Sequence, residues 1–212
     1  MTQALSLLQI ILIYAIPILF AITVHEVAHG WVASRLGDQT ARMMGRLTLN
    51  PIKHIDPIGT IIVPALLLLT VGFLFGWAKP VPITWRNLRH PRRDAALVAI
   101  AGPFANLVMV ILWALVTKVG ELVGAKAVVM MGQIGIGINL ILMLLNIIPI
   151  PPLDGSRVVS SLLPPRWAAK YSLIEPYGFI ILLVLILFGL LGVVLGPAVM
   201  GLSQMVARLF GL

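Results

Sequence analysis

The sequence predicts an all-α membrane protein that crosses the bilayer with about four to six helices. Hydrophobic residues fill 60% of the 212 positions and charged residues only 10%, whereas charged residues make up about 25% of a typical soluble domain. Several apolar runs approach the roughly 20 residues that a helix needs to span a membrane. These runs use up most of the chain, so we predict one membrane domain over residues 1–212 and no separate soluble domain.

Loops that carry most of the Lys and Arg residues separate the apolar runs. Pro17 lies in the first run and predicts a kink. No Lys or Arg precedes Arg35, so this run lacks the basic start of a secretion signal and is predicted to remain as a span. Beyond Pro197 the sequence leaves open whether the tail lies in the interface or crosses. The runs cover residues 3–34, 57–76, 95–117, 127–150 and 177–195.

The run at residues 57–76 differs from the others. Pro64 and several glycines interrupt it, and basic loops flank it on both sides. Positively charged loops prefer the cytoplasmic side, so a complete crossing would place one of these loops outside the cell. We therefore predict a re-entrant segment that enters the membrane and returns, packed against protein as irregular backbone requires.

Residues 40–50 include a possible short β element. The order Arg46-Leu47-Thr48-Leu49 alternates polar and apolar side chains as a strand does. Exposed strand edges do not occur in lipid, so such a strand would pair with protein or line an aqueous cavity, where it could align an extended substrate. A plain polar loop explains the same residues equally well.

Charge and cysteine content narrow the chemistry. The formal net charge is +8, but the basic residues are spread through the loops between apolar runs. Membrane topology and anionic lipid headgroups account for that distribution, so nucleic-acid binding is not predicted. Cysteine is absent, which excludes disulfides and thiolate metal sites and leaves His, Asp and Glu as the candidate ligands.

The first run contains ionisable residues in the order His25-Glu26-Val27-Ala28-His29. A charged side chain at the centre of a membrane helix costs about 2.5–3.5 kcal/mol on insertion scales, so such groups indicate a functional site. His25 and His29 lie four residues apart, on one face of a helix, where both imidazoles can reach one ion. In the H-E-x-x-H pattern the histidines bind Zn²⁺ and the glutamate acts as general base.

A proline-rich stretch, Ile148-Pro149-Ile150-Pro151-Pro152-Leu153-Asp154-Gly155, ends the run at 127–150. Prolines break the helix and place Asp154 at a rigid turn. Asp154 is the natural third metal ligand, and the alternative is a plain helix-capping aspartate. Glu175 is a rival third ligand, because other membrane H-E-x-x-H proteases resemble a His-His-Glu scheme.

Six stretches together resemble the site-2 protease family (peptidase M50) of intramembrane zinc metalloproteases, in its small bacterial and archaeal form. They are HEVAHG, GRLTLNPIKHIDPIG, GWAKPVP, RNLRHPRRDAA, AGPFAN and NIIPIPPLDG, and they cover most of positions 20–157. The resemblance implies one zinc ion held by His25, His29 and Asp154, Glu26 as general base, and Asn146 near the substrate carbonyl. No stretch looks like the PDZ or CBS modules that some relatives carry.

The same resemblance implies that the enzyme cleaves peptide bonds within or beside transmembrane segments of membrane-protein substrates. It also implies a prokaryotic plasma membrane. The basic loop that follows the first run places the active site toward the cytoplasmic side and the N-terminus outside, by the positive-inside rule. His54 could be a gate or a group behind the metal ligands, although a loop histidine is the simpler explanation, and His90 is predicted at the surface. The alternatives are a divalent metal-ion transporter and a catalytically idle binding protein of the same fold.

Overall fold

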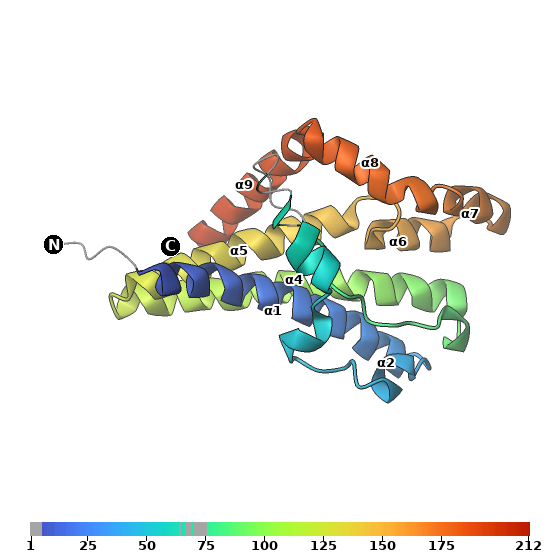
Figure 1. Cartoon of the computed structure of the whole chain (residues 1–212), viewed down its shortest axis with the longest axis horizontal. Helices are drawn as coiled ribbons and strands as arrows, with labels where there is room; N and C mark the ends of the chain where they lie inside the picture. Colours follow the sequence, from blue (N-terminus) through green and yellow to red (C-terminus); the bar gives the residue numbers. More distant parts are fainter. Residues whose placement is uncertain (1–5, 64, 67–68, 70–75) are drawn as a thin grey trace.

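The computed structural model describes residues 6–63, 65–66, 69 and 76–212, and within these residues the chain contains helices and no strand (Figure 1). Among them, four helices are long and apolar enough to cross a membrane: α1 (Leu7–Arg35), α4 (Pro91–Leu122), α5 (Lys126–Ile147) and α9 (Leu190–Phe210). A fifth span exists if α7 (Pro165–Ser172) and α8 (Glu175–Leu187), bent by 58°, form one broken crossing. The predicted all-α multi-pass fold is confirmed.

The three long helices α1, α4 and α5 lie side by side and form the body of the molecule (Figure 1). Glycines on α5 let α4 approach closely, because a Cβ atom on Gly132 or Gly135 would lie 2.2 Å from Thr117 and 2.3 Å from Trp113, respectively. The main core joins α4, α5 and α9 and consists of Met109, Val110, Trp113, Ala114, Ile136, Leu140, Met143 and Val206. This packing gives the site a fixed frame.

Residues 40–50 do not form the short β element considered from the sequence. The chain makes a single helical turn, α2 (Thr40–Met43), and then reverses at Gly45, whose φ of 63° favours glycine. The Arg46 side chain, which is 8% exposed, donates to the carbonyl oxygens of Lys79 and Pro80 at 2.9 and 3.3 Å. The alternation at 46–49 therefore reflects an arginine turned inward from a loop, which is the alternative that the sequence allowed.

The two ends of the predicted re-entrant segment meet. The Trp77 N–H donates to the Gly59 carbonyl at 3.0 Å, and the Thr60 hydroxyl donates to the Trp77 carbonyl at 2.9 Å. The segment begins with a π-helical turn at Pro57–Ile62, which follows a 3₁₀ turn at Pro51–His54. Residues 64, 67–68 and 70–75 lie outside the described residues. The described ends of this stretch therefore lie side by side, as the predicted re-entrant segment requires.

The C-terminal part of the chain is less tightly packed. The short α6 (Asp154–Leu162) and α7 lead into α8, and among the described side chains of α8 only Gly178 and Leu182 are buried. The predicted span at 177–195 is wrong in its boundaries, because the helix breaks at Gly189, whose φ of 69° is left-handed. The tail after Pro197 belongs to the continuous helix α9.

Candidate metal centre

Three side chains that are far apart in the sequence converge between α1 and α6. His25 and His29 lie one turn apart on α1, and Asp154 is the first residue of α6. The two imidazole Nε2 atoms are 3.0 Å apart, and the Asp154 Oδ2 lies 3.2 Å from that of His25 and 3.3 Å from that of His29. Among the described residues these three form a group that could hold a metal ion.

The triangle of ligand atoms has the size that zinc requires. Tetrahedral zinc with ligand distances near 2.0–2.1 Å separates its ligand atoms by about 3.3 Å. The observed separations of 3.0–3.3 Å match the edges of such a tetrahedron. The three protein ligands leave one vertex open, as catalytic zinc sites do.

A relay of two buried amides fixes the orientation of His25. The Asn139 amide nitrogen donates to the Gly135 carbonyl at 2.8 Å, which leaves its oxygen to accept from the Asn106 amide nitrogen at 2.9 Å. The Asn106 oxygen must then accept, and it lies 2.6 Å from Nδ1 of His25. Because a carbonyl can only accept, the relay places a proton on Nδ1, so the neutral imidazole presents the lone pair of Nε2 toward the other ligands.

His29 is oriented in the same sense by the backbone. Its Nδ1 donates to the carbonyl of Val98 at 2.7 Å, so in the neutral imidazole Nε2 also presents a lone pair. The Asp154 Oδ2 is buried and has no hydrogen-bond donor among the described residues. Three potential ligand atoms thus face one another at 3.0–3.3 Å, and a bound cation would satisfy all three when both imidazoles are neutral.

Two glycines that pack closely against the main chain position Asp154 beside the histidines. A Cβ atom on Gly155 would lie 2.1 Å from the carbonyl oxygen of Ile147, so α6 can start against the end of α5 only with glycine there. Gly178 of α8 packs against the Pro151 carbonyl, where a Cβ atom would lie 1.8 Å away. The Tyr171 hydroxyl donates to the Pro149 carbonyl at 2.6 Å. The proline-rich loop is therefore held from both sides.

Comparison with known proteins identifies the family. The model of Peptidase family M50 matches residues 13–188 of this chain. The chain belongs to this family. It is 40% identical over 202 residues to a Bacillus subtilis (strain 168) protein named "Putative zinc metalloprotease YwhC", a match covering 92% of this chain and 89% of that protein.

Two mycobacterial relatives of this M50 peptidase are longer than the matched region. The Mycolicibacterium smegmatis protein "Putative zinc metalloprotease Rip2" is 32% identical over 171 residues, covering 80% of this chain and 64% of the relative. Its namesake from Mycobacterium tuberculosis (strain H37Rv) is 29% identical over 170 residues with the same coverage. No solved structure matches the chain. Family membership and the convergent ligand atoms identify the M50 peptidase as a multi-pass zinc metalloprotease.

Glu26 lies at the edge of a cavity beside the ligand triangle. Its Oε2 accepts from the Val81 N–H at 2.7 Å, and Arg46 holds the two carbonyls that precede this N–H. Gly30 makes room for the contact, because a Cβ atom there would lie 2.7 Å from the Val81 side chain. The cavity measures about 620 Å³ and is lined mainly by apolar side chains from α1, α5, α8 and the 76–80 segment. His25 also lines it.

The structure separates the remaining predicted residues. Asn146 lines the cavity with Glu26, and its amide nitrogen donates to the Leu142 carbonyl at 3.0 Å. His54 is buried away from the ligand group, with Nε2 donating to the Thr48 carbonyl at 2.9 Å. Glu175 forms an ion pair with Arg157 at 2.7 Å and is not among the three convergent ligands. The exposed His90 precedes the first turn of α4.

Sequence reasoning missed three residues that build this centre of the M50 peptidase. Asn106 and Asn139 form the relay to His25, and both are fully buried. Gly102 lets α4 approach the metal ligands, because a Cβ atom there would lie 2.4 Å from Nε2 of His29 and 2.5 Å from Cε1 of His25. The sequence feature that could have pointed to Asn106 is a polar amide four residues after Gly102 in an apolar run. By itself this pattern indicates only close packing between helices.

Proposed function

We propose that this M50 peptidase is an intramembrane zinc endopeptidase that cleaves within or beside transmembrane segments of membrane-protein substrates. The observation that carries the proposal is the convergence of three potential ligand atoms beside Glu26 and an apolar cavity. One membrane domain would hold the whole site. We assign His25, His29 and Asp154 as zinc ligands, in line with the relatives named as zinc metalloproteases.

Glu26 is the proposed general base. Zinc, when bound, supplies a Lewis acid that polarises the scissile carbonyl and acidifies a water molecule. The Glu26 carboxylate takes the proton of the attacking water and returns it to the leaving amine. Its Oε2 already accepts from the Val81 N–H, which leaves Oε1 for that transfer. Asn146, on the facing wall of the cavity, is the candidate donor to the oxygen of the scissile carbonyl.

The cavity supports an extended apolar substrate. Leu142, Leu145, Leu182 and Ile186 line it, together with Trp77, whose ring packs edge-on against Phe179 with centroids 5.4 Å apart. A substrate helix keeps its carbonyls in intrahelical hydrogen bonds, so it must unwind before a carbonyl can reach the metal. We therefore expect substrates with helix-breaking residues near the cleaved bond. The expected partners are the lipid bilayer and the transmembrane segment of a substrate protein, and nucleic acid is not an expected partner.

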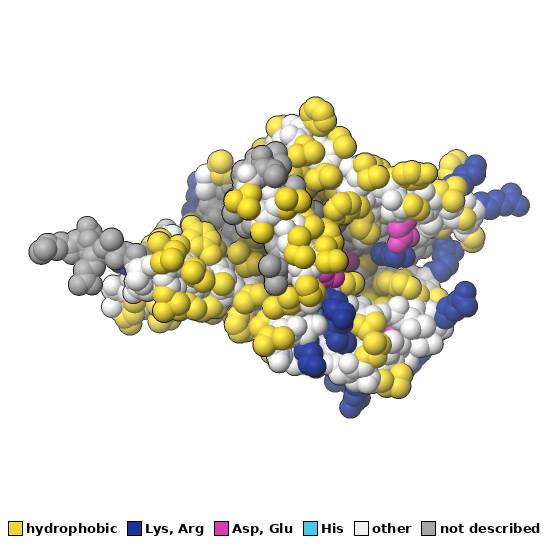
Figure 2. Space-filling view, viewed as in Figure 1, with side chains coloured by type: hydrophobic (Ala, Val, Ile, Leu, Met, Phe, Trp, Pro, Cys, Tyr) yellow, Lys and Arg dark blue, Asp and Glu magenta, His cyan; other side chains and the backbone are white. Residues whose placement is uncertain are grey.

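The charges support a cytoplasmic active site in a prokaryotic plasma membrane. Figure 2 shows Lys and Arg gathered at the end of the molecule where α2, α6 and α7 lie. The opposite end, where α4 connects to α5, carries Lys118 and Lys126. By the positive-inside rule, the end with α2, α6 and α7 faces the cytoplasm.

Single cysteines test this orientation, because the chain has none of its own. Exposed positions Met43, Arg86, Val123 and Leu162 are suitable. An impermeant thiol reagent added to intact cells should label position 123 alone, and permeabilisation should expose the other three. Labelling of position 86 in intact cells would contradict the re-entrant segment, and labelling of position 162 would contradict a shared side for the two metal-binding motifs.

The decisive experiment is Glu26→Gln in the full chain, with zinc content and cleavage of a model single-span substrate measured together. The amide keeps the shape but cannot accept a proton, so zinc should stay while cleavage falls at least about 100-fold. Glu121→Gln, the same change at an exposed ion pair with Lys118, is the matched control. Normal cleavage by the Glu26 variant would refute the mechanism, and zinc binding without any cleavage by the unaltered chain would favour a metal transporter or an idle binding protein.

A further inference from the structure

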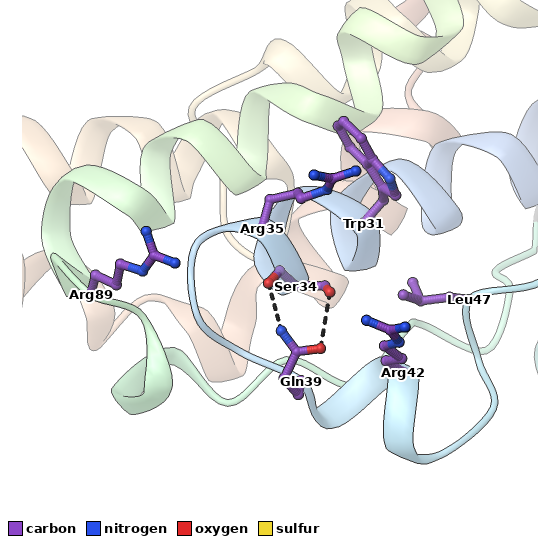
Figure 3. A pocket seen from close by; sticks show the side chains of 7 residues that line it. All are labelled: Trp31, Ser34, Arg35, Gln39, Arg42, Leu47 and Arg89. Atoms are coloured by element: carbon purple, nitrogen blue, oxygen red, sulfur yellow. Dashed lines mark hydrogen bonds between the residues drawn. The ribbon is translucent and has the colours of Figure 1, made fainter.

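A second cavity lies at the opposite end of the α1 catalytic motif, outside the metal centre. It measures about 680 Å³ and is formed by the last turn of α1, by α2 and by the segment before α4. Figure 3 shows Arg35 beside Trp31 on α1, Arg42 on α2 and Arg89 on the neighbouring loop. We call this group, with Ser34, Gln39 and Leu47 as the other lining residues, the arginine pocket.

The three guanidinium groups of the arginine pocket have no carboxylate partner. The chain contains seven acidic side chains, all of them among the described residues. Two are in ion pairs with Lys118 and Arg157, one is at the metal centre, and four accept hydrogen bonds from nearby N–H or O–H groups. They are Glu26, Asp38, Asp56, Asp94, Glu121, Asp154 and Glu175. Three positive charges thus line one cavity, and none of them is in an ion pair with any of these carboxylates.

The polar groups between the arginines are already engaged. Gln39 donates through Nε2 to the Ser34 carbonyl at 2.7 Å and accepts at Oε1 from the Ser34 hydroxyl at 3.2 Å (Figure 3). The Arg35 guanidinium stacks over the Trp31 ring, with its Cζ atom 5.1 Å from the ring centroid. The pocket therefore offers cationic donors, and its lining includes no carboxylate for a cationic ligand.

We propose that the arginine pocket binds the phosphate of an anionic phospholipid headgroup. Guanidinium groups match phosphate oxygens through paired N–H donors. A lipid source is favoured over free phosphate because α1 is a membrane-spanning helix that ends at Arg35, so the pocket lies at headgroup depth. Trp31 is 53% exposed one turn before that end, the position where tryptophan anchors helices in the interface.

The chemistry selects an anionic lipid over a zwitterionic one. Phosphatidylcholine carries the same phosphate, but its choline would meet guanidinium groups and no carboxylate in the pocket. Phosphatidylglycerol adds no such cation. Each basic residue near an anionic lipid surface strengthens the attraction of the protein to that lipid. Three arginines together should therefore give phosphatidylglycerol an affinity about tenfold or more above that of phosphatidylcholine.

The test titrates the full chain in detergent micelles with phosphatidylglycerol or phosphatidylcholine and counts bound lipids by native mass spectrometry. The wild type should hold one phosphatidylglycerol at least about tenfold more tightly than phosphatidylcholine. The variant Arg35→Gln/Arg42→Gln/Arg89→Gln should lose that preference. The matched control, Arg86→Gln/Arg93→Gln/Arg166→Gln, removes three other exposed charges and should keep it.

Two further arms make each outcome decisive. Arg42→Gln alone, at an exposed side chain, should weaken phosphatidylglycerol binding severalfold even if the triple variant does not fold. Inorganic phosphate at millimolar concentration should not displace the lipid. Equal phosphatidylglycerol binding by the pocket and control variants would overturn the proposal, and displacement by inorganic phosphate would reassign the pocket to a soluble anion.

Discussion

The two halves of the metal centre are held in different ways. On the α1 side, polar side chains position the histidines through the relay of Asn106 and Asn139 and through the Val98 carbonyl. On the α6 side, the backbone of a proline-rich loop positions Asp154 through glycines that permit contact between main chains. The first half is a hydrogen-bond network inside packed helices. The second half, which we call the backbone seat, consists of main-chain contacts at Gly155 and Gly178 that leave no room for a Cβ atom.

The two halves are therefore sensitive to different substitutions. A network of side chains loses orientation when one amide is removed, but its helices remain packed around the core. A backbone seat tolerates changes in its side chains and fails when a single Cβ atom is added.

The largest effect should come from removing the ligand itself. Asp154→Ala should lower zinc affinity by more than about 100-fold, because only the two histidines then remain as protein ligands. Glu175→Ala should leave zinc content unchanged, because Glu175 pairs with Arg157 instead. Metal analysis of both purified proteins decides between them, and the reverse pattern would move the third ligand.

The backbone seat should fail almost as strongly with one methyl group. Gly155→Ala places a Cβ atom against the Ile147 carbonyl and displaces α6, so zinc affinity should fall at least about tenfold. Gly137→Ala is the matched control, since its Cβ atom would meet nothing within 4 Å. Equal zinc binding by the two variants would show that the loop is more yielding than the structure implies.

The relay should make a graded contribution. Asn106→Ala removes the acceptor of the His25 Nδ1 proton and should weaken zinc binding about 10- to 100-fold. Asn139→Ala removes only the partner of Asn106 and should have a smaller effect. Isothermal titration of the metal-free proteins with zinc measures both, and a larger loss at Asn139 than at Asn106 would contradict the order of the relay.

Arg46 should affect the rate and not the metal. It holds the carbonyls of Lys79 and Pro80 and so places the Val81 N–H against Glu26. Arg46→Lys keeps the charge but lacks the forked donors, so kcat should fall about tenfold with zinc content unchanged. A change in KM alone would indicate a different role.

The smallest effect concerns the acid stability contributed by Asp38, which lies between α1 and α2. Burial would raise the pKa of Asp38, but hydrogen bonds from Thr40, Asn87 and Thr84 outweigh it and hold the pKa below the ordinary value of 3.8. A lowered folded-state pKa stabilises the protein above pH 3.8, and that stability is lost as pH falls through the folded-state value. Asp38→Asn should lower the free energy of unfolding by about 1 kcal/mol at neutral pH, and the Tm of the variant should fall less steeply than that of the wild type as the pH is lowered.

The sequence was sufficient for the features that depend on local pattern. The apolar runs predicted α1, α4 and α5, and the spacing of His25 and His29 with the turn at Asp154 predicted the ligand group that the structure brings together. The break at Gly189 was missed because apolar residues continue on both sides of it. A long hydrophobic run does not reveal where a helix bends.

Features that depend on contacts between helices could not be predicted from one sequence. The role of Asn106 requires the rotation of α4 against α1, and that of Asn139 requires α5 to present an amide at the same level. Arg46 resembled one polar position of a strand, and only its contact with the 79–80 carbonyls shows it turned inward. These positions are set by packing, which period and composition do not encode.

The meeting of the ends of residues 57–76 has a consequence for chain entropy. Hydrogen bonds from the Trp77 N–H to the Gly59 carbonyl and from the Lys79 N–H to the His54 carbonyl close this stretch into a loop. For a flexible loop, doubling the length raises the entropic cost of closure by only about 0.6 kcal/mol. The number of residues between these hydrogen bonds therefore has little effect on the entropy of closing the loop, and the Val81 contact to Glu26 lies on the far side of that closure.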